Sequence, residues 1–342
     1  MISDSDLKKI SDYLEKSKKP LFLFDDDNDG LCSFLLLRGF TKKGDGMPIK
    51  TSPELNSSMV GIVRRYGPDY VFVLDKPLVS QEFVDKVIVP VVWIDHHEPI
   101  KRDGVRYFNP KLDGSEDHSS TTYWCYKAVG GKLWIAVIGA VSDWTIPDYF
   151  NRFKDEYPDL VSEKITPTEL LYNSKLGRLC RIFSFLNKGD HKWLKEVMGL
   201  LLNIGSPYDI LEGKTVEGKI ILGRAEKIEK KYNALLDDAL KSEKDGKLII
   251  YTYASADTSF TSDLSNELLY RNSGYFIIVA RQKDDKIYMS LRSDVFPVRS
   301  ILESALKEVK GYGGGHFYAC GAGINEDDFS RFAEIIKKEV NR

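Results

Sequence analysis

Three features are scarce or absent in this chain of 342 residues, and each excludes a class of protein. No apolar run approaches the roughly 20 residues of a membrane-spanning helix. The N-terminus lacks the charged and apolar regions of a signal peptide. The formal net charge is only −2, so any affinity for phosphate must be local. We therefore expect a cytoplasmic protein without a membrane partner.

The chain also has few cysteines, and none of the four (Cys32, Cys125, Cys180 and Cys320) forms a CxxC pair. We interpret them as isolated small hydrophobic residues in a reducing compartment. Internal repeats and low-complexity segments are absent as well, and the length favours two domains.

A short apolar run at residues 21–24 leads directly into the acidic segment 25–30. An unbroken apolar run is typical of a parallel strand that helices cover on both faces. If the extended geometry continued, Asp25, Asp27 and Asp29 would project to one side, because side chains alternate along a strand. Three carboxylates that close raise one another's pKa unless cations lie among them, so the segment predicts a metal site.

Two other interpretations fit this segment taken alone. Asp-x-Asp-x-Asp-Gly is also the first half of an EF-hand calcium loop. That loop needs helices on both flanks and Glu at its twelfth position, where this chain has Leu36. The second alternative is an ordinary acidic turn, since Asp and Gly are common turn residues.

Two further apolar runs end in acidic residues or histidines. Residues 70–74 precede Asp75, and residues 87–94 precede the triplet Asp-His-His at 95–97. Because the carboxyl ends of parallel strands meet at one edge of a sheet, the three clusters are expected to converge there. With a helix predicted over residues 31–40, this is the beginning of a doubly wound α/β unit.

One more acid is a candidate for the same site. Residues 134–141 are apolar and precede Ser142 and Asp143, which resembles the earlier strand ends, although the run also suits a buried helix. Before it, the Ser-Ser-Thr-Thr segment 119–122 opens a helix that reaches residue 129, and we interpret these residues as helix caps.

The rest of the chain predicts a helical connection and a second α/β unit. Helices are expected over residues 166–203 and 215–243, the second with a charged, solvated face. Beyond them we expect strands over 248–253, 275–280 and 286–291, and helices over 262–270 and 327–340. The predicted organisation is an α/β fold: a doubly wound, mainly parallel-sheet domain at 1–210, a helical linker at 211–245 and a smaller α/β domain at 246–342.

The types of ligand indicate which metal and which reaction to expect. Carboxylate oxygens suit magnesium or calcium, and added imidazole shifts the preference towards manganese. We therefore expect Mn²⁺, with Mg²⁺ as the alternative. One ion would be overcoordinated by so many acids and histidines, so two ions are expected. Paired ions are the usual device for in-line displacement at phosphorus, which predicts phosphoester hydrolysis.

The second unit carries groups that suit a phosphate. Gly313, Gly314 and Gly315 let backbone N–H groups approach an anion, although the glycine run alone also reads as a flexible turn. Arg292 can bind a phosphate through two hydrogen bonds, and His316 can donate another. Together they predict a substrate clamp that faces the metal site across a cleft.

These residues resemble the DHH family of phosphoesterases, whose first domain binds the metals and whose second is the DHHA1 domain. The matching positions span nearly the whole chain in the family's order: Asp25-x-Asp27-x-Asp29-Gly30, Asp75, Asp95-His96-His97, Asp143, Ser290-x-Arg292-Ser293 and Gly313-Gly314-Gly315-His316. The resemblance implies a DHH domain joined by the helical linker to a DHHA1 domain.

The resemblance also implies a role for each matching residue. Asp25 and Asp27 would hold the first metal ion, and Asp75 would bridge it to the second. The second ion would be held by Asp29, His96 and Asp143. His97 would contact the scissile phosphate, and the predicted catalytic set is Asp75, Asp95 and His97. Substrate-binding residues would be Ser290, Arg292, Ser293, Gly313, Gly314, Gly315 and His316.

The first motif favours one branch of the family. It begins with Asp25, as in the RecJ nucleases, whereas nanoRNases and small-molecule members generally begin it with His. This implies a RecJ-like exonuclease acting on single-stranded DNA or RNA. Bacterial RecJ carries further C-terminal domains, including an oligonucleotide-binding fold, so the architecture is closer to archaeal RecJ-like proteins and to enzymes that degrade very short oligonucleotides.

Two alternatives stay open. One is a nanoRNase-like phosphoesterase for short oligonucleotides or nucleotides such as pAp. The other is a non-catalytic, Cdc45-like scaffold that binds replication proteins, against which the intact set of metal ligands argues.

Overall fold

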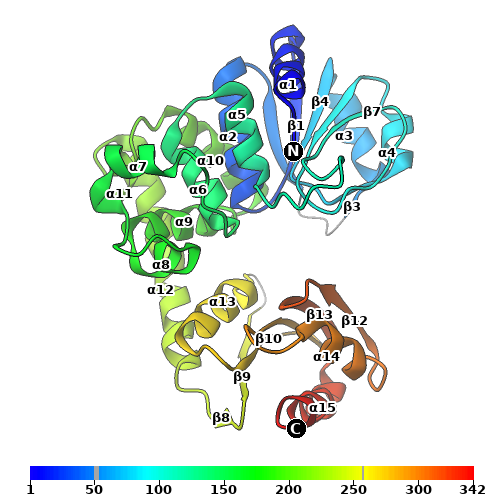
Figure 1. Ribbon diagram of the computed structural model, residues 1–342, viewed down its shortest axis with the longest axis vertical. Coiled ribbons are helices and arrows are strands. Elements are labelled where there is room, and N and C mark those ends of the chain that lie inside the picture. Colours follow the sequence, from blue (N-terminus) through cyan, green and yellow to red (C-terminus); the bar gives the residue numbers. More distant parts are fainter. Residues whose placement is uncertain (50–53, 256–257) are drawn as a thin grey trace. The chain divides into compact units, whose positions relative to one another are not determined.

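The computed structural model describes residues 1–49, 54–255 and 258–342. The chain forms two compact units, residues 1–225 and 226–342 (Figure 1). The border between them falls inside the long helix α12 (Val216–Ala239). Each unit is built around its own sheet.

The first unit contains a five-stranded, fully parallel sheet in the order β2-β1-β4-β6-β7. Its strands are β1 (Pro20–Asp25), β2 (Asp45–Ile49), β4 (Tyr70–Leu74), β6 (Val91–Ile94) and β7 (Val105–Phe108). Successive residues of β1 enter two different cores, Phe22 and Phe24 on one face and Leu21 and Leu23 on the other. Burial on both faces explains why this strand needs no polar alternation.

Helices cover both faces of this sheet (Figure 1). The core on one face includes α1 (Asp4–Lys16), α2 (Asn28–Thr41), α5 (Thr121–Val129) and α6 (Leu133–Ser142). The other face packs against α3 (Val60–Tyr66) and α4 (Gln81–Lys86). The doubly wound α/β fold predicted from the sequence is confirmed.

A helical segment follows the sheet and extends the first of these cores. It comprises α7 (Phe150–Glu156), α8 (Pro167–Asn173), α9 (Lys175–Leu186), α10 (His191–Asn203) and α11 (Pro207–Leu211). A separate two-stranded parallel pair joins β3 (Glu54–Leu55) to β5 (Leu78–Val79).

The second unit has a mixed six-stranded sheet in the order β12-β13-β11-β10-β9-β8. The strands are β8 (Lys244–Asp245), β9 (Leu248–Ala254), β10 (Phe276–Lys283), β11 (Lys286–Arg292), β12 (Gly311–Gly315) and β13 (Ala319–Asn325). Its helices are α13 (Thr261–Arg271), α14 (Val298–Ala305) and α15 (Phe329–Val340). The predicted strands and helices of this unit are present, whereas β12, β13 and α14 had not been predicted.

One predicted strand differs from the structure. The strand expected over residues 87–94 begins only at Val91. Val87 instead ends α4, and Ile88 is 91% exposed. Pro90 separates the two parts, because proline fixes φ and lacks the N–H that a strand interior would use.

The extended geometry stops at Asp25, the last residue of β1, so the condition under which Asp25, Asp27 and Asp29 would project to one side is not met. Asp27 is the N-cap of α2, and Asp29 lies in the first turn of that helix. The residues of the glycine run, Gly311–Gly315, form the exposed edge strand β12 rather than a flexible turn.

Two further features are settled by the structure. The apolar run before Asp143, which suited either a strand or a helix, is helix α6. All four cysteines are buried and unbridged, as expected of small hydrophobic residues. Within the described residues, none of the helices combines the length and apolarity needed to cross a bilayer.

Candidate metal centre

The turn between β1 and α2 positions the first acids. The Oδ1 atom of Asp27 accepts a hydrogen bond from the backbone N–H of Gly30 at 2.9 Å, which caps the helix. Gly30 packs so tightly against β1 that a Cβ atom there would lie 2.3 Å from the carbonyl oxygen of Asp25. Only glycine therefore fits this turn, and Asp29, the residue before Gly30, is buried.

The carboxylate of Asp29 lies at the N-terminus of α5. Its Oδ2 accepts from the backbone N–H of Thr121 at 2.8 Å, and its Oδ1 accepts from that of Thr122 at 2.7 Å. Unpaired N–H groups and the helix dipole favour an anion at this position. Ser120 caps the same helix by accepting from the backbone N–H of Tyr123 at 3.2 Å. Capping by the Ser-Ser-Thr-Thr segment is thus confirmed at Ser120, whereas Thr121 and Thr122 hold Asp29.

Asp75 follows β4 with a strained backbone and a buried side chain. Its φ is +58°, a left-handed value that non-glycine residues rarely adopt, and its relative exposure is 1%. The Thr121 hydroxyl donates to Asp75 Oδ1 at 3.0 Å. Strain of this kind persists where the surroundings enforce it, and it is concentrated at functional sites.

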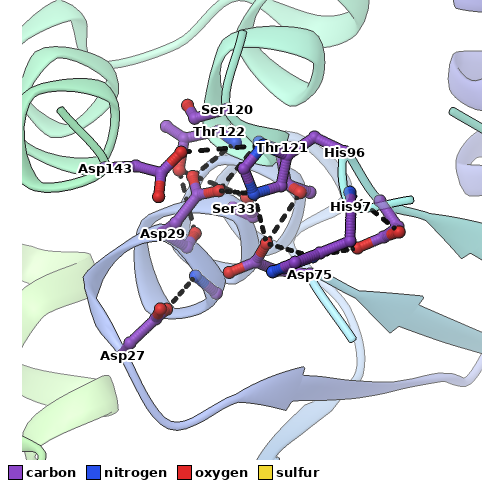
Figure 2. Close-up of polar contacts among 12 residues, drawn as sticks. Asp27, Asp29, Ser33, Asp75, His96, His97, Ser120, Thr121, Thr122 and Asp143 are labelled. Atoms are coloured by element: carbon purple, nitrogen blue, oxygen red, sulfur yellow. Dashed lines mark hydrogen bonds and ion pairs between the residues drawn. The ribbon is translucent and has the colours of Figure 1, made fainter. Parts of the chain in front are cut away.

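His96 lies at the centre of the cluster, between three carboxylates (Figure 2). Its Nε2 is 3.5 Å from Asp75 Oδ1 and 3.9 Å from Asp29 Oδ2, and its Nδ1 is 3.6 Å from Asp143 Oδ2. Asp143 caps the C-terminus of α6. Asn28 holds the end of α6 against α2 by donating to the Ser142 hydroxyl at 2.9 Å.

His97 is fixed by Asp95, which is fully buried. Asp95 Oδ1 lies 2.8 Å from His97 Nδ1, and Asp95 Oδ2 accepts from the backbone N–H of His97 at 3.1 Å. Tyr107 and Asn109 also donate to Asp95, each at 3.2 Å. An acid that accepts this many hydrogen bonds is a rigid support for the imidazole ring.

The cluster has the composition of a metal site. Two groups of side chains, Asp75 with His96 and His97, and Asp29 with His96 and Asp143, each place their ligand atoms within 4.8 Å of one another. His96 belongs to both. A mixed oxygen and nitrogen donor set with several carboxylates fits Mn²⁺ or Mg²⁺. The residues present therefore fit a divalent metal.

The electrostatics of the cluster point the same way. Burial, followed by repulsion from Asp29, raises the pKa values of Asp75 and Asp143 well above the ordinary range. Loss of hydration and repulsion from Asp25 and Asp29 raise the pKa of Asp27 to about 7. Because the Asp27 side chain is exposed, repulsion is the more important of these two causes. Divalent cations among these acids would relieve the repulsion.

The two histidines are perturbed in opposite directions. Burial lowers the pKa of His96 and outweighs the attraction of Asp29, so its neutral, ligating form is favoured. Burial also lowers the pKa of His97, but the hydrogen bond with Asp95 and the negative charges of Asp95, Asp27 and Asp29 together outweigh it, and the net pKa is raised. His97 is thus suited to donate a hydrogen bond to an anion.

Among the described residues, two predicted metal ligands, Asp25 and Asp27, belong to neither of the two groups that share His96. Asp25 Oδ1 accepts from the ammonium of Lys76 at 2.7 Å, and the Lys76 side chain is only 2% exposed. Asp27 instead caps α2. Both acids nevertheless lie close enough to raise the pKa of Asp75 through repulsion.

The second unit brings the two predicted substrate motifs onto one sheet. Ser290 pairs across the ladder with Gly321, which in turn pairs with Gly314, so β13 separates the two motifs by a single strand. His316 is exposed, as are Gly313 and Gly315. The backbone N–H of His316 donates to Ala319 and closes the β12–β13 hairpin.

Two residues of the Ser290-x-Arg292-Ser293 motif form hydrogen bonds within the second unit. The Arg292 guanidinium donates to Asn266, to Ser262 and to the carbonyl of Cys320, which ties β11 to α13 and β13. Ser293 is 1% exposed, and its hydroxyl donates to the carbonyl of Tyr275. Their assignment as substrate ligands stays a prediction.

Several residues that support the cluster were not predicted. Asn109 directly follows β7, so the strand-end argument applied to residues 105–108 would have found it. The two threonine amides and Lys76 have no comparable signal, because a backbone donor and a buried lysine become evident only in the folded chain.

Comparison with known proteins gives a family match for the second unit and fold matches for the whole chain. Residues 245–342 match the model of the DHHA1 domain. RecJ from Thermus thermophilus, solved with Mn²⁺, has 17% identity and a TM-score of 0.67. The match covers 98% of this chain and 54% of that one, so this chain spans about half the length of that RecJ. No curated protein sequence matches the chain.

Two further solved structures share the architecture over most of their length. An exonuclease RecJ bound to manganese has 15% identity and a TM-score of 0.66, covering 100% of this chain and 95% of that one. A pGpG-specific phosphodiesterase from Vibrio cholerae has 15% identity and a TM-score of 0.56, covering 95% and 99%. The comparisons thus identify a DHHA1 domain at residues 245–342 and show that the whole chain shares the fold of these solved structures.

Proposed function

We propose that this protein is a metal-dependent phosphodiesterase that degrades single-stranded DNA or RNA from an end, as a RecJ-like exonuclease with two Mn²⁺ ions. The observation that carries the proposal is the convergence of Asp29, Asp75, His96, His97 and Asp143 within 4.8 Å in two groups that share His96. Exonuclease RecJ bound to manganese has the same fold, which supports both the reaction and the metal.

The side chains have distinct tasks in this proposal. Asp29, Asp75, His96 and Asp143 would hold the metal ions, with Asp25 and Asp27 completing the set on the side of β1. Bound there, the ions would polarise the phosphate and neutralise the charge that develops on it. His97 would donate a hydrogen bond to a phosphate oxygen, with Asp95 keeping its imidazole oriented. From the DHHA1 domain, Arg292 and His316 would bind phosphate.

A nuclease assay tests the proposal directly. Metal-free protein is incubated with end-labelled single-stranded DNA and RNA, with and without Mn²⁺ or Mg²⁺. We expect mononucleotide release only with metal, and a loss of about 100-fold or more in Asp75→Asn. Asp113→Asn, an exposed acid of the same unit that pairs with the N-terminus, is the matched control and should retain full activity. Absence of cleavage by the wild type with either metal would refute the proposal.

A second function shares the site but differs in substrate length. The likeness to a pGpG-specific phosphodiesterase over 99% of that chain favours very short oligonucleotides as the alternative. A length series from dinucleotides upward, in DNA and RNA and labelled at either end, separates the two. A rate that falls steeply beyond a few nucleotides selects the short-substrate enzyme. Stoichiometric binding to replication proteins without turnover would instead select the Cdc45-like scaffold.

A further inference from the structure

The residue after Asp143 is a large aromatic side chain exposed to solvent. Trp144 is 43% exposed, and Ile146, two positions later, is 38% exposed. Tryptophan combines a large apolar face with a polar N–H, and such side chains are enriched where proteins bind partners. Because Trp144 directly follows Asp143, a member of the His96 cluster, its backbone lies next to the candidate metal centre.

The backbone at Trp144 is one that normally belongs to glycine. Helix α6 ends in a Schellman motif, in which Trp144 N–H donates to Val141 O at 3.1 Å and Thr145 N–H donates to Ala140 O at 3.0 Å. This motif needs a left-handed residue at the position of Trp144, whose φ is +59°. Tryptophan here costs conformational energy that glycine would avoid, so helix capping alone does not explain the choice.

A second aromatic ring supports the first. Tyr172 of α8 has its ring centroid 6.4 Å from that of Trp144, with the two planes inclined by 55°. This tilted arrangement is a favourable one for aromatic pairs. It limits the orientations of the indole and leaves part of its surface open.

We propose that Trp144, held by Tyr172, is a stacking platform for a nucleobase next to the phosphate bound at the Asp143 cluster. The inference rests on the proposed function and adds to it a way for the site to recognise an unpaired base. Every base has a π-face, so an aromatic platform binds single strands with little sequence preference. In a duplex those faces are covered by neighbouring bases, so the platform would select for single strands.

Three substitutions separate stacking from folding. Trp144→Gly places at the left-handed position the residue that suits it best, and Trp144→Asn is a second variant that tolerates the same backbone. Trp144→Phe keeps an aromatic face. Phe40→Ala, which removes another partly exposed ring of the first unit, is the matched control. Cooperative thermal unfolding of each variant confirms that it is folded.

The measurement is equilibrium binding of fluorescein-labelled oligothymidylate and oligouridylate in Ca²⁺, chosen to limit cleavage. Each oligomer is also made with one base removed at a successive position, leaving the backbone intact. Loss of one stacked base is expected to weaken wild-type binding by about 5- to 150-fold at a single position. Trp144→Gly and Trp144→Asn should bind the intact oligomer that much more weakly and be insensitive to base removal there.

The coupling between side chain and base decides the outcome. The platform is supported if the losses of affinity from base removal and from Trp144→Gly or Trp144→Asn are not additive. Phe40→Ala should then behave as the wild type, and Trp144→Phe nearly so. Additive losses, unchanged affinity, or no binding by the wild type overturn it. Cleavage with Mn²⁺ is scored separately: cleavage without coupling refutes only the platform, and coupling without cleavage refutes only the hydrolytic function.

Discussion

The ammonium of Lys76 lies 2.7 Å from the carboxylate of Asp25, and together they join the ends of two neighbouring parallel strands. The Lys76 side chain is 2% exposed, whereas that of Asp25 is 26% exposed. A buried ammonium is costly unless it is paired, so Asp25 makes this lysine tolerable. The pair also places an amino group beside the cluster of acids.

Replacing Lys76 by methionine, which fills similar space, should destabilise the metal-free protein by about 1.5–3 kcal/mol, because Asp25 loses a charged hydrogen bond. The double variant with Asp25→Asn should recover most of that loss, since no charge is then left unpaired. Urea unfolding of the two single variants and the double variant measures the coupling. A Lys76→Met protein as stable as the wild type would show that the pair contributes nothing.

Asp75→Asn should raise stability without metal while lowering activity by about 100-fold or more. Burial and neighbouring carboxylates raise the pKa of Asp75, so its ionised form destabilises the fold at neutral pH, and a neutral amide relieves this. Asparagine also tolerates the left-handed backbone at this position. We expect a higher melting temperature in EDTA and a smaller rise on adding Mn²⁺.

Asp113→Asn serves as the control for this pair of effects, because its side chain is exposed and pairs with the N-terminus. It should leave both the melting temperature in EDTA and the response to Mn²⁺ close to those of the wild type. Equal melting temperatures for Asp75→Asn and the wild type in EDTA would contradict the argument from repulsion.

Two glycines of α2 should respond oppositely to alanine. A Cβ atom at Gly30 would lie 2.3 Å from a backbone oxygen, so Gly30→Ala must shift the turn at a cost of about 1–3 kcal/mol and with reduced activity. At Gly39 a Cβ atom meets nothing within 4 Å, so Gly39→Ala should stabilise the helix by about 0.5–1 kcal/mol. Chemical denaturation of both variants, which share one helix, checks the contrast.

Asp69 gives a pH dependence away from the candidate metal centre. Burial opposes ionisation, but hydrogen bonds from the Ser17 hydroxyl and from the backbone N–H groups of Lys18 and Lys19 outweigh it and lower its pKa below the ordinary 3.8. A lowered pKa in the folded state adds stability above the unfolded pKa, and this is lost as the pH falls through the folded value.

Asp69→Asn should therefore unfold less steeply with acid than the wild type and be less stable at neutral pH. Ser17→Ala removes one of the three donors and should show part of the effect. The check is the midpoint of thermal unfolding measured from neutral to acidic pH. Parallel curves for all three proteins would exclude a contribution from this carboxylate.

Much of the fold follows from the sequence because buried parallel strands leave unbroken apolar runs. Residues 21–24 and 70–74 could be predicted as strands, and the acids after them were correctly expected at one edge of the sheet. The run that became α6 could not be assigned, since a short, fully buried segment lacks the periodicity that separates helix from strand.

Two interpretations that the structure does not bear out concern the glycine run and the turn after β1. Glycine is depleted in strands, yet Gly311–Gly315 forms β12 because β13 supplies its hydrogen-bonding partner. Asp29 enters a helix rather than continuing the strand, because Asp27 caps α2 and Gly30 allows the close turn. Neither outcome can be read from spacing alone.

The composition of β12 bears on how the protein behaves at high concentration. An exposed edge strand can pair with a strand from another copy of the protein. This association is strengthened when the side chains of the two copies interdigitate. Four of the five residues of β12 are glycine, so an incoming strand would gain main-chain bonds but almost no interlocking surface. The backbone N–H groups of the free edge of β12 can thus stay exposed while the protein has little tendency to self-associate.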